Sequence, residues 1–233
     1  MSRLLVHVEG ETEETFVNEV LSPYLYNRGY SAVSARLMGN TRQRSRRGGI
    51  KGWDEVRKDI LGHLKQDAGR LVTTMVDYYG LPQSGNKTWP GRKTAGGIVF
   101  EQKAKTVEDA LSADISQEMG GAFNSGRFIP YVMMHEFEAM LFSDCEGFGR
   151  VIGRVDLVEP LQAIRDQFAN PEEIDDSPRT APSKRIEHLM PNYQKPLMGN
   201  LAALEIGIHA IRRECPHFEE WLERLERSLA TSG

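Results

Sequence analysis

A carboxylate directly after a predicted β-strand is the first residue of the chain that could do chemistry. Glu9 follows the apolar run at residues 3–8, which is typical of a buried strand, and Glu13 stands four positions further on. Gly10 permits a sharp turn between them, and Thr12 is a suitable N-cap for the helix that follows. The turn could therefore aim both carboxylates at one point.

Acidic residues near a helix N-terminus also have a purely structural interpretation, because they complement the helix dipole. That interpretation is sufficient for Glu11 and Glu14. It stays open for Glu13. It does not account for Glu9, since helix capping does not need a carboxylate on the last residue of a strand.

Two further predicted strands also end in carboxylates. Asp77 follows the β-branched run at 70–76, and Glu136 and Glu138 follow the run at 127–134. Parallel strands end at one edge of a sheet, where ligands bind. Carboxylates gathered there repel one another unless a cation is present, and oxygen ligands favour Mg²⁺ or Mn²⁺ over zinc. The sequence predicts a metal site made of Glu9, Glu13, Asp77, Glu136 and Glu138.

Two basic loops could hold a polyanionic substrate beside this acidic edge. Residues 39–49 carry four arginines, and the glycine-rich residues 83–97 carry further cations. Arginine binds phosphate in a bidentate way that does not depend on base sequence, although a solvated charged loop is the alternative interpretation. The candidate nucleic-acid contacts are Arg42, Arg44, Arg46, Arg47, Lys87, Arg92 and Lys93.

Strand and helix patterns alternate along the first part of the chain. Strands are predicted at 3–8, 31–38, 70–76 and 127–134. Helices are predicted at 12–27 and 50–67, and residues 98–119 form either one helix or two short ones. After residue 144 the pattern becomes helical and is interrupted by prolines, with helices predicted at 157–169, 182–189, 197–213 and 216–229. The alternation predicts an α/β fold, an open parallel sheet with flanking helices at 1–144, followed by a helical C-terminal extension at 145–233.

Composition limits the class of protein. The 233 residues are 39% hydrophobic and 27% charged with a net charge of −4, which excludes a uniformly basic nucleic-acid coat but not a local basic patch. No apolar run is long enough to span a membrane, and the N-terminus lacks a signal-peptide pattern. Cys145 and Cys215 are far apart, so we expect free thiols in a reducing cytoplasm.

Several of these segments resemble the Toprim superfamily, a fold of topoisomerases, primases and nucleases. The resemblance starts at Val8-Glu9-Gly10-Glu11-Thr12-Glu13, whose Glu-Gly-x-x-Glu form is most similar to the OLD-nuclease branch. The wider chain looks like a family of stand-alone Toprim-like proteins encoded beside AAA- or ABC-type ATPases in phage-defence settings. The segments that carry this closer resemblance are Met75-Val76-Asp77-Tyr78-Tyr79-Gly80-Leu81-Pro82, His135-Glu136-Phe137-Glu138-Ala139 and Tyr193-Gln194-Lys195-Pro196.

The resemblance implies roles for individual residues. Glu9 and Glu13 match the two glutamates of the OLD-type motif, and Asp77 matches the first aspartate of an Asp-x-Asp motif. Tyr79 stands where the second aspartate belongs, so a carboxylate from residues 135–139 would have to replace it.

We therefore expect a Mg²⁺- or Mn²⁺-dependent endonuclease with Glu9, Asp77, Glu136 and Lys195 as catalytic residues. Lys195 would stabilise a pentacovalent phosphate, although a surface lysine is an equal alternative. The resemblance adds an anti-phage role with an ATPase partner, and DNA, RNA and a homodimer all stay open. Two alternative functions stay open. The first is a catalytically weak or inactive interaction subunit of an ATPase, which the replacement of an aspartate by Tyr79 favours. The second is phosphoryl transfer or hydrolysis on a small nucleotide.

Overall fold

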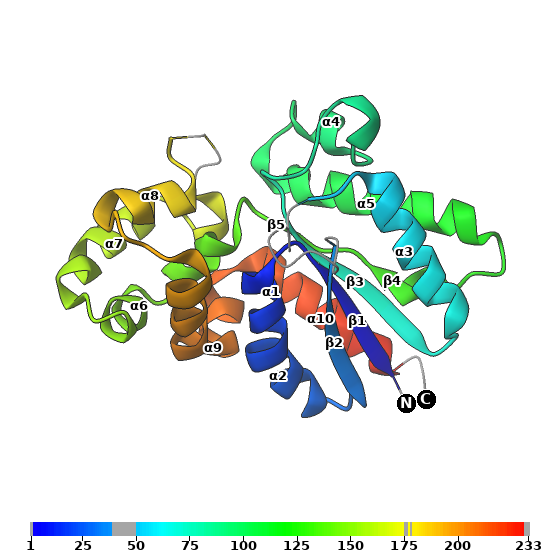
Figure 1. Cartoon of the computed structure of the whole chain (residues 1–233), viewed down its shortest axis with the longest axis horizontal. Helices are drawn as coiled ribbons and strands as arrows, with labels where there is room; N and C mark the ends of the chain where they lie inside the picture. Colours follow the sequence, from blue (N-terminus) through cyan, green and yellow to red (C-terminus); the bar gives the residue numbers. More distant parts are fainter. Residues whose placement is uncertain (1, 39–49, 175–176, 178, 231–233) are drawn as a thin grey trace.

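A parallel β-sheet forms the centre of the molecule (Figure 1). The computed structural model describes residues 2–38, 50–174, 177 and 179–230. Within them the strand order is β2-β1-β3-β4, and β5 also pairs with β3; every pairing is parallel. The strands are β1 Arg3–Val8, β2 Ala32–Leu37, β3 Arg70–Asp77, β4 Phe128–Ile129 and β5 Val132–Met133. The predicted α/β fold is confirmed.

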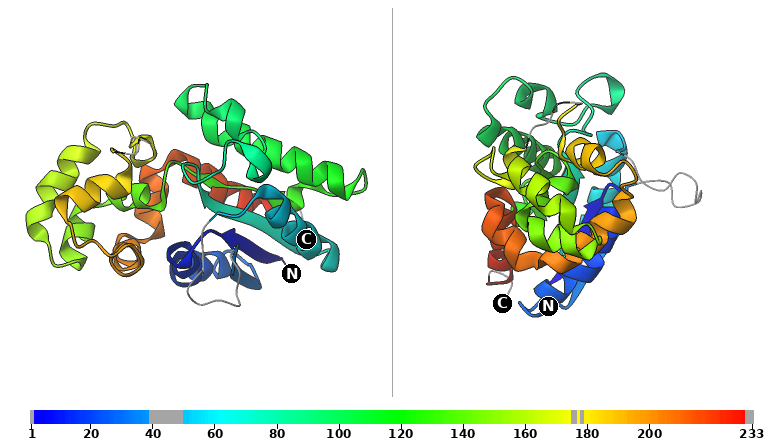
Figure 2. Two further views of the ribbon diagram at one scale, coloured as in Figure 1. Left: turned by 45° about the horizontal axis from the view of Figure 1, so that its top comes forward. Right: turned by 90° about the vertical axis from the view of Figure 1, so that its left-hand side faces the viewer.

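Helices flank the sheet and continue into a lobe at its side. Next to the sheet are α1 Glu11–Phe16, a π-helical turn Val17–Leu21, α2 Ser22–Tyr26, α3 Trp53–Gln66, α5 Phe100–Met119 and α10 Pro216–Ala230, and α4 Arg92–Ala95 packs against α5. The lobe contains α6 Cys145–Val151, α7 Val158–Arg165, α8 Pro182–Leu189 and α9 Asn200–Glu214, and it lies beside the sheet (Figure 2). No helix in the described ranges has the length and apolar character that a membrane crossing requires.

Alternation along β3 divides the hydrophobic core into two parts. Leu71 and Met75 pack in a cluster with the α1–α2 region, α9 and α10, whereas Val72 and Val76 pack with α3 and α5. Successive side chains of a strand point to opposite faces, so β3 is buried on both. This explains why its sequence is nearly continuous in apolar residues.

Helix α10 fastens the end of the chain to the sheet. The indole nitrogen of Trp221 donates a hydrogen bond of 2.9 Å to Thr73 Oγ1 on β3. The Tyr131 ring stacks on Trp221 with centroids 4.5 Å apart and planes 12° apart. The first cluster thus contains residues from both sides of position 144. The domain boundary at that position stays a prediction.

The strand expected at 127–134 is divided in two. β4 and β5 are separated at Pro130 and Tyr131, because proline has no amide hydrogen to give to a central ladder. Thr74 on β3 replaces the missing ladder bonds. Its hydroxyl accepts a 3.0 Å hydrogen bond from the Tyr131 amide and donates one of 3.0 Å to the Tyr131 carbonyl.

The first helix also starts differently from the prediction. Its N-cap is Gly10, and Thr12 lies buried within the first turn instead of capping it. The π-helical turn directly precedes α2, where Pro23 stands at the start. A widened turn is a common response to a residue that disturbs the i to i−4 ladder. The prediction also missed α6, and α4 lies inside the expected loop at 83–97.

A buried charge cluster holds the start of α10. Glu172 accepts hydrogen bonds from the amides of His217 (2.8 Å) and Phe218 (3.0 Å), so its carboxylate satisfies the free end of the helix. His217 Nε2 lies 3.0 Å from Glu108 Oε1, which also accepts a bond from the Val132 amide. Burial lowers the pKa of His217, but the negative charges of Glu108 and Glu172 outweigh it, and the pKa is raised.

Replacement of His217 by Asn should therefore destabilise the protein most at low pH. A raised histidine pKa contributes stability that is complete below the unfolded pKa, about 6.5, and is lost as pH rises through the folded pKa. We expect the free energy of unfolding to fall by about 2 kcal/mol near pH 6 and by clearly less near pH 9, measured by urea denaturation. His188→Asn on the surface of α8 should change stability little at either pH. If His217→Asn lowered the free energy of unfolding equally at pH 6 and pH 9, the ion pairs of protonated His217 would not be the source of the stabilisation.

Candidate active site

The predicted carboxylates lie at one edge of the sheet. Val8, the last residue of β1, pairs with Met75, and Asp77, the last residue of β3, pairs with Met133 on β5. The strands therefore end side by side, and the chain segments that leave them begin at the same place. Glu9 and the residues that follow β5 join Asp77 at this edge.

Lys195 stands among these carboxylates. Its ammonium Nζ lies 2.8 Å from Glu138 Oε2 and 3.8 Å from Asp77 Oδ2. Glu138 is completely buried and Asp77 nearly so, whereas 37% of the lysine side chain remains exposed. Lys195 lies on the segment of the lobe between α8 and α9, so the lobe supplies the cation and the sheet edge supplies Asp77.

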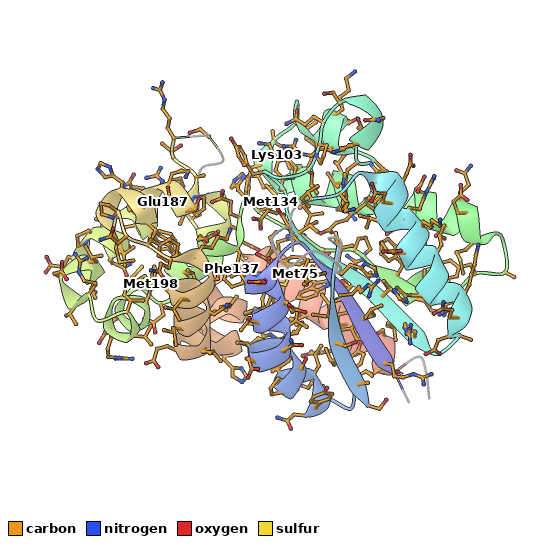
Figure 3. All side chains as sticks on the ribbon, viewed as in Figure 1. Met75, Lys103, Met134, Phe137, Glu187 and Met198 are labelled. Atoms are coloured by element: carbon orange, nitrogen blue, oxygen red, sulfur yellow. The ribbon has the colours of Figure 1, made fainter. Side chains whose placement is uncertain are left out.

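Asp77 is fixed by the backbone as well as by Lys195. Its Oδ1 accepts a 3.0 Å hydrogen bond from the Phe137 amide. Figure 3 marks Phe137 between the sheet and the lobe, at the beginning of the 3₁₀ segment Phe137–Ser143. A carboxylate that accepts a backbone hydrogen bond has a defined orientation, which leaves Oδ2 directed to the lysine.

Glu136 and Glu138 have different environments although they are two residues apart. Glu136 Oε2 accepts a 3.0 Å hydrogen bond from the Ser183 amide at the start of α8. Glu138 points inward to Lys195. Of the two, Glu138 is therefore the better replacement for the carboxylate that is missing at Tyr79, whose side chain is 40% exposed.

Glu13 turns back towards the end of β1. Its Oε2 accepts a 2.9 Å hydrogen bond from the Gly10 amide, and the side chain is buried. Gly10 has an extended backbone, so glycine is not required there for its dihedral angles. The space is tight instead, because a Cβ at this position would lie 3.1 Å from Glu13 Oε2 and would displace that carboxylate slightly.

The electrostatics of the cluster disfavour several negative charges at once. Burial and the charge of Glu13 raise the pKa of Glu9 to about 7, against the opposing effect of Lys195. Burial raises the pKa of Asp77 well above its usual range and also raises that of Glu138. For Lys195, burial lowers the pKa, but Asp77 and Glu138 outweigh it and the pKa is raised. Lys195 therefore stays charged and stabilises its neighbours as anions.

Tyr193 is a site residue to which the sequence analysis assigned no role, although it lies in one of the segments that carry the resemblance. Its hydroxyl is buried with no hydrogen-bond partner among the described residues. Burial and the nearby charge of Glu138 raise its pKa. A Cβ at Gly199 would lie 2.9 Å from the hydroxyl oxygen, so a glycine there keeps the space for it. The signal that the sequence offered is the position of this tyrosine two residues before Lys195.

Only some of the residues predicted to contact nucleic acid lie in the described part of the chain. Lys87 and Lys93 are exposed on the segment between β3 and α5. Arg92 is buried: its guanidinium donates to the carbonyl and the hydroxyl of Tyr78, each at 3.0 Å, so this side chain is committed to the fold. The expected contacts Arg42, Arg44, Arg46 and Arg47 lie outside the described residues.

The donor set fits a hard divalent cation in its chemistry. Glu9 Oε2 and Glu138 Oε1 are buried without a hydrogen-bond partner in the described part of the chain, and such oxygens are satisfied by a proton or a cation. However, no three His, Cys, Asp or Glu side chains in that part lie close enough together to hold a metal as they stand. Coordination would require the carboxylates around Lys195 to move closer to one another.

The fold and the site define an α/β protein whose parallel sheet carries a group of carboxylates at the C-terminal ends of its strands. Residues 8–226 match the family described as "Domain of unknown function (DUF4276)". The chain therefore belongs to the DUF4276 family. No curated protein and no solved structure matches it. The family match neither supports nor opposes the Toprim resemblance, which stays a prediction.

The substitution Glu9→Gln should stabilise the protein above neutral pH. Folding raises the pKa of Glu9 from 4.5 to about 7, so the folded state holds a proton that the unfolded state releases between these values. Wild-type stability should fall across this range, and the variant should gain about 2 kcal/mol over wild type near pH 8 but little near pH 4. Thermal and urea denaturation would measure this, with the exposed Glu11→Gln as a control. If Glu9→Gln increased stability equally at all pH values, or lowered it near pH 8, the raised pKa of Glu9 would be contradicted.

Proposed function

We propose that the chain is a divalent-metal-dependent nuclease that hydrolyses phosphodiester bonds in DNA or RNA. The observation that carries the proposal is the group of buried carboxylates around Lys195, which come from the ends of β1 and β3 and from the segment after β5. Structural ion pairs do not need so many buried acids. Raised carboxylate pKa values at one sheet edge are typical of functional sites.

Mg²⁺ or Mn²⁺ would be held by Asp77 and Glu138 with Glu9, and by Glu13 and Glu136 in support. When bound, the ion would polarise a phosphoryl oxygen and lower the pKa of a water molecule. Among the chain's own groups, Lys195 is placed to offset negative charge on the phosphate, because its ammonium is partly exposed.

Glu9 is also suited to act as a general base or acid. A general base or acid works best when its pKa lies near the working pH, and burial brings the pKa of Glu9 to about 7. Its free oxygen Oε2 lies at the edge of the same group of carboxylates. Glu9 would therefore accept or supply a proton in the hydrolysis.

Lys87 and Lys93 would hold the nucleic-acid backbone beside the acidic edge, and Arg42, Arg44, Arg46 and Arg47 remain candidates for the same role. The resemblance to stand-alone Toprim-like proteins extends the proposal. It adds an anti-phage effector role with an AAA- or ABC-type ATPase partner in the cytoplasm.

A non-catalytic interaction subunit is the second candidate, and two observations favour it. Lys195 already pairs with Glu138 and Asp77, so the chain itself offsets part of the negative charge of the acidic group. In addition, Leu197, Leu201 and Leu204 are 56%, 40% and 47% exposed, and their spacing of four and three residues places them on one side of the helical segment. Such a stripe could contact another protein.

A nuclease panel tests the proposal directly. Plasmid, single-stranded DNA, tRNA and total RNA would be incubated with Mg²⁺ or Mn²⁺, with and without the ATPase partner. We expect metal-dependent cleavage that Asp77→Ala and Glu9→Ala each reduce by about a hundredfold or more, because both remove a metal ligand or a proton-transfer group.

The control for this panel is Glu11→Ala, which removes a carboxylate from the same turn. Glu11 is exposed and only complements the helix dipole, so its loss should leave cleavage unchanged. Cleavage that survives both Asp77→Ala and Glu9→Ala would rule out the site. Absence of cleavage in every condition, with folded protein, would favour the interaction subunit.

A further inference from the structure

A cleft lies at the opposite edge of the sheet from the acidic site. Its volume is about 720 Å³, and it is lined by Arg70, the first residue of β3, whereas Asp77 is the last. Seven residues of extended strand separate the two edges by roughly 23 Å. The cleft therefore cannot belong to the group of carboxylates around Lys195.

The lining of the cleft is strongly one-sided in charge. Four arginines contribute to it: Arg70, Arg127, Arg224 and Arg227. Ser2, Ser112, Ser125 and Asn124 supply further polar groups, whereas Ser228 donates its hydroxyl to the Leu225 carbonyl; none of the described lining residues is an aspartate or a glutamate. The cleft thus has a local excess of guanidinium groups in a chain whose net charge is −4.

Arg127 is held in position by uncharged partners. Its guanidinium donates to the backbone carbonyls of Leu64 (2.7 Å), Asp67 (2.6 Å) and Arg70 (3.2 Å). No carboxylate in the described part of the chain forms an ion pair with it, and burial lowers its pKa. The charge of Asp67 acts on Arg127 without a direct ion pair, so the positive charge is fixed in place and only partly offset.

The other three arginines are only weakly neutralised. Arg70 Nε lies 3.6 Å from Asp67 Oδ2, and the same carboxylate already pairs with Arg3 at 2.7 Å. Arg224 Nη1 lies 3.8 Å from Glu108 Oε2, whose carboxylate also pairs with His217. These shared carboxylates leave an excess of positive charge in the cleft.

Arg227 is the most accessible of the four. Its side chain is 68% exposed and pairs at the surface with Glu223 at 3.1 Å. An exposed pair of this kind contributes little and is easily exchanged for another anion. Arg227 can therefore turn to a ligand in the cleft at small cost.

We propose that this cleft binds a small phosphorylated ligand of mononucleotide size. Arginine forks and serine hydroxyls match phosphate oxygens, and the volume is typical of small-molecule sites. Inorganic phosphate would fill only a small part of it, and the remaining volume leaves room for the rest of a larger ligand. This site goes beyond the proposed nuclease activity and does not depend on it.

A long nucleic acid fits this place less well. Helix α10 borders the cleft and carries the exposed carboxylates Glu220 and Glu223. A polyanion that extended beyond the cleft along this helix would meet like charges. A ligand whose phosphates remain within the cleft avoids this repulsion.

Calorimetric titration of the full chain with ADP, in the presence of a metal chelator, tests the site. The chelator prevents metal-bridged binding at the acidic edge. We expect ADP to bind, adenosine and inorganic phosphate to bind at least about tenfold more weakly, and Arg224→Gln/Arg227→Gln to weaken ADP binding by at least about tenfold. The matched control is Arg213→Gln, a residue on α9 with the same 68% exposure and a carboxylate partner, which should leave the affinity unchanged.

A second variant keeps the test sound if the double substitution affects folding. Ser112→Phe narrows the cleft but leaves every arginine in place, and it should also weaken ADP binding. The proposal is overturned if ADP does not bind, if the folded variants bind it as wild type does, or if inorganic phosphate binds equally well. Tighter binding of a short single-stranded oligonucleotide that depends on the same arginines would overturn it in favour of a nucleic-acid site.

Discussion

The contact of Lys195 with Asp77 and Glu138 is the constraint on which the rest of the site depends. Removal of one partner from a buried ion pair typically costs about 3–5 kcal/mol, because the remaining charge stays buried and unpaired. Here two carboxylates share one ammonium, and Glu9 Oε2 and Glu138 Oε1 still lack hydrogen-bond partners among the described residues. The chain thus maintains a place where negative charge is in excess and where a further cation or a proton would be bound favourably.

The parallel sheet is what makes this concentration of charge possible. Because β1, β3 and β5 run in one direction, the residues after their last positions meet at a single edge, and Glu9, Asp77 and Glu138 come from distant parts of the sequence to that edge. The lobe completes the site by supplying Lys195 and the Ser183 amide that binds Glu136. The same geometry gathers Arg70 and Arg127 near the opposite edge, so the sheet separates an acidic end from a basic one.

The sequence was sufficient for the fold class and for the edge at which the carboxylates lie, since both follow from strand patterns and from the position of Asp77 after an apolar run. It could not distinguish Glu136 from Glu138. That difference arises in a 3₁₀ segment and from the position of α8, which no local pattern encodes. The break at Pro130 could have been predicted from proline alone. The basic cleft could not, because its arginines are up to 157 residues apart and only the packing of α10 brings them together.

Binding of Mn²⁺ measured by calorimetry tests the central claim most directly, since it asks whether the acidic edge is a cation site without requiring a substrate. The account predicts that the wild-type chain binds Mn²⁺ above neutral pH and more weakly as pH falls through about 7, where Glu9 takes up a proton. Asp77→Asn should weaken binding by about a hundredfold, while Glu14→Gln should not change it. The account would be contradicted if the wild-type chain bound no Mn²⁺ both above and below pH 7. It would also be contradicted if Asp77→Asn left the affinity for Mn²⁺ unchanged.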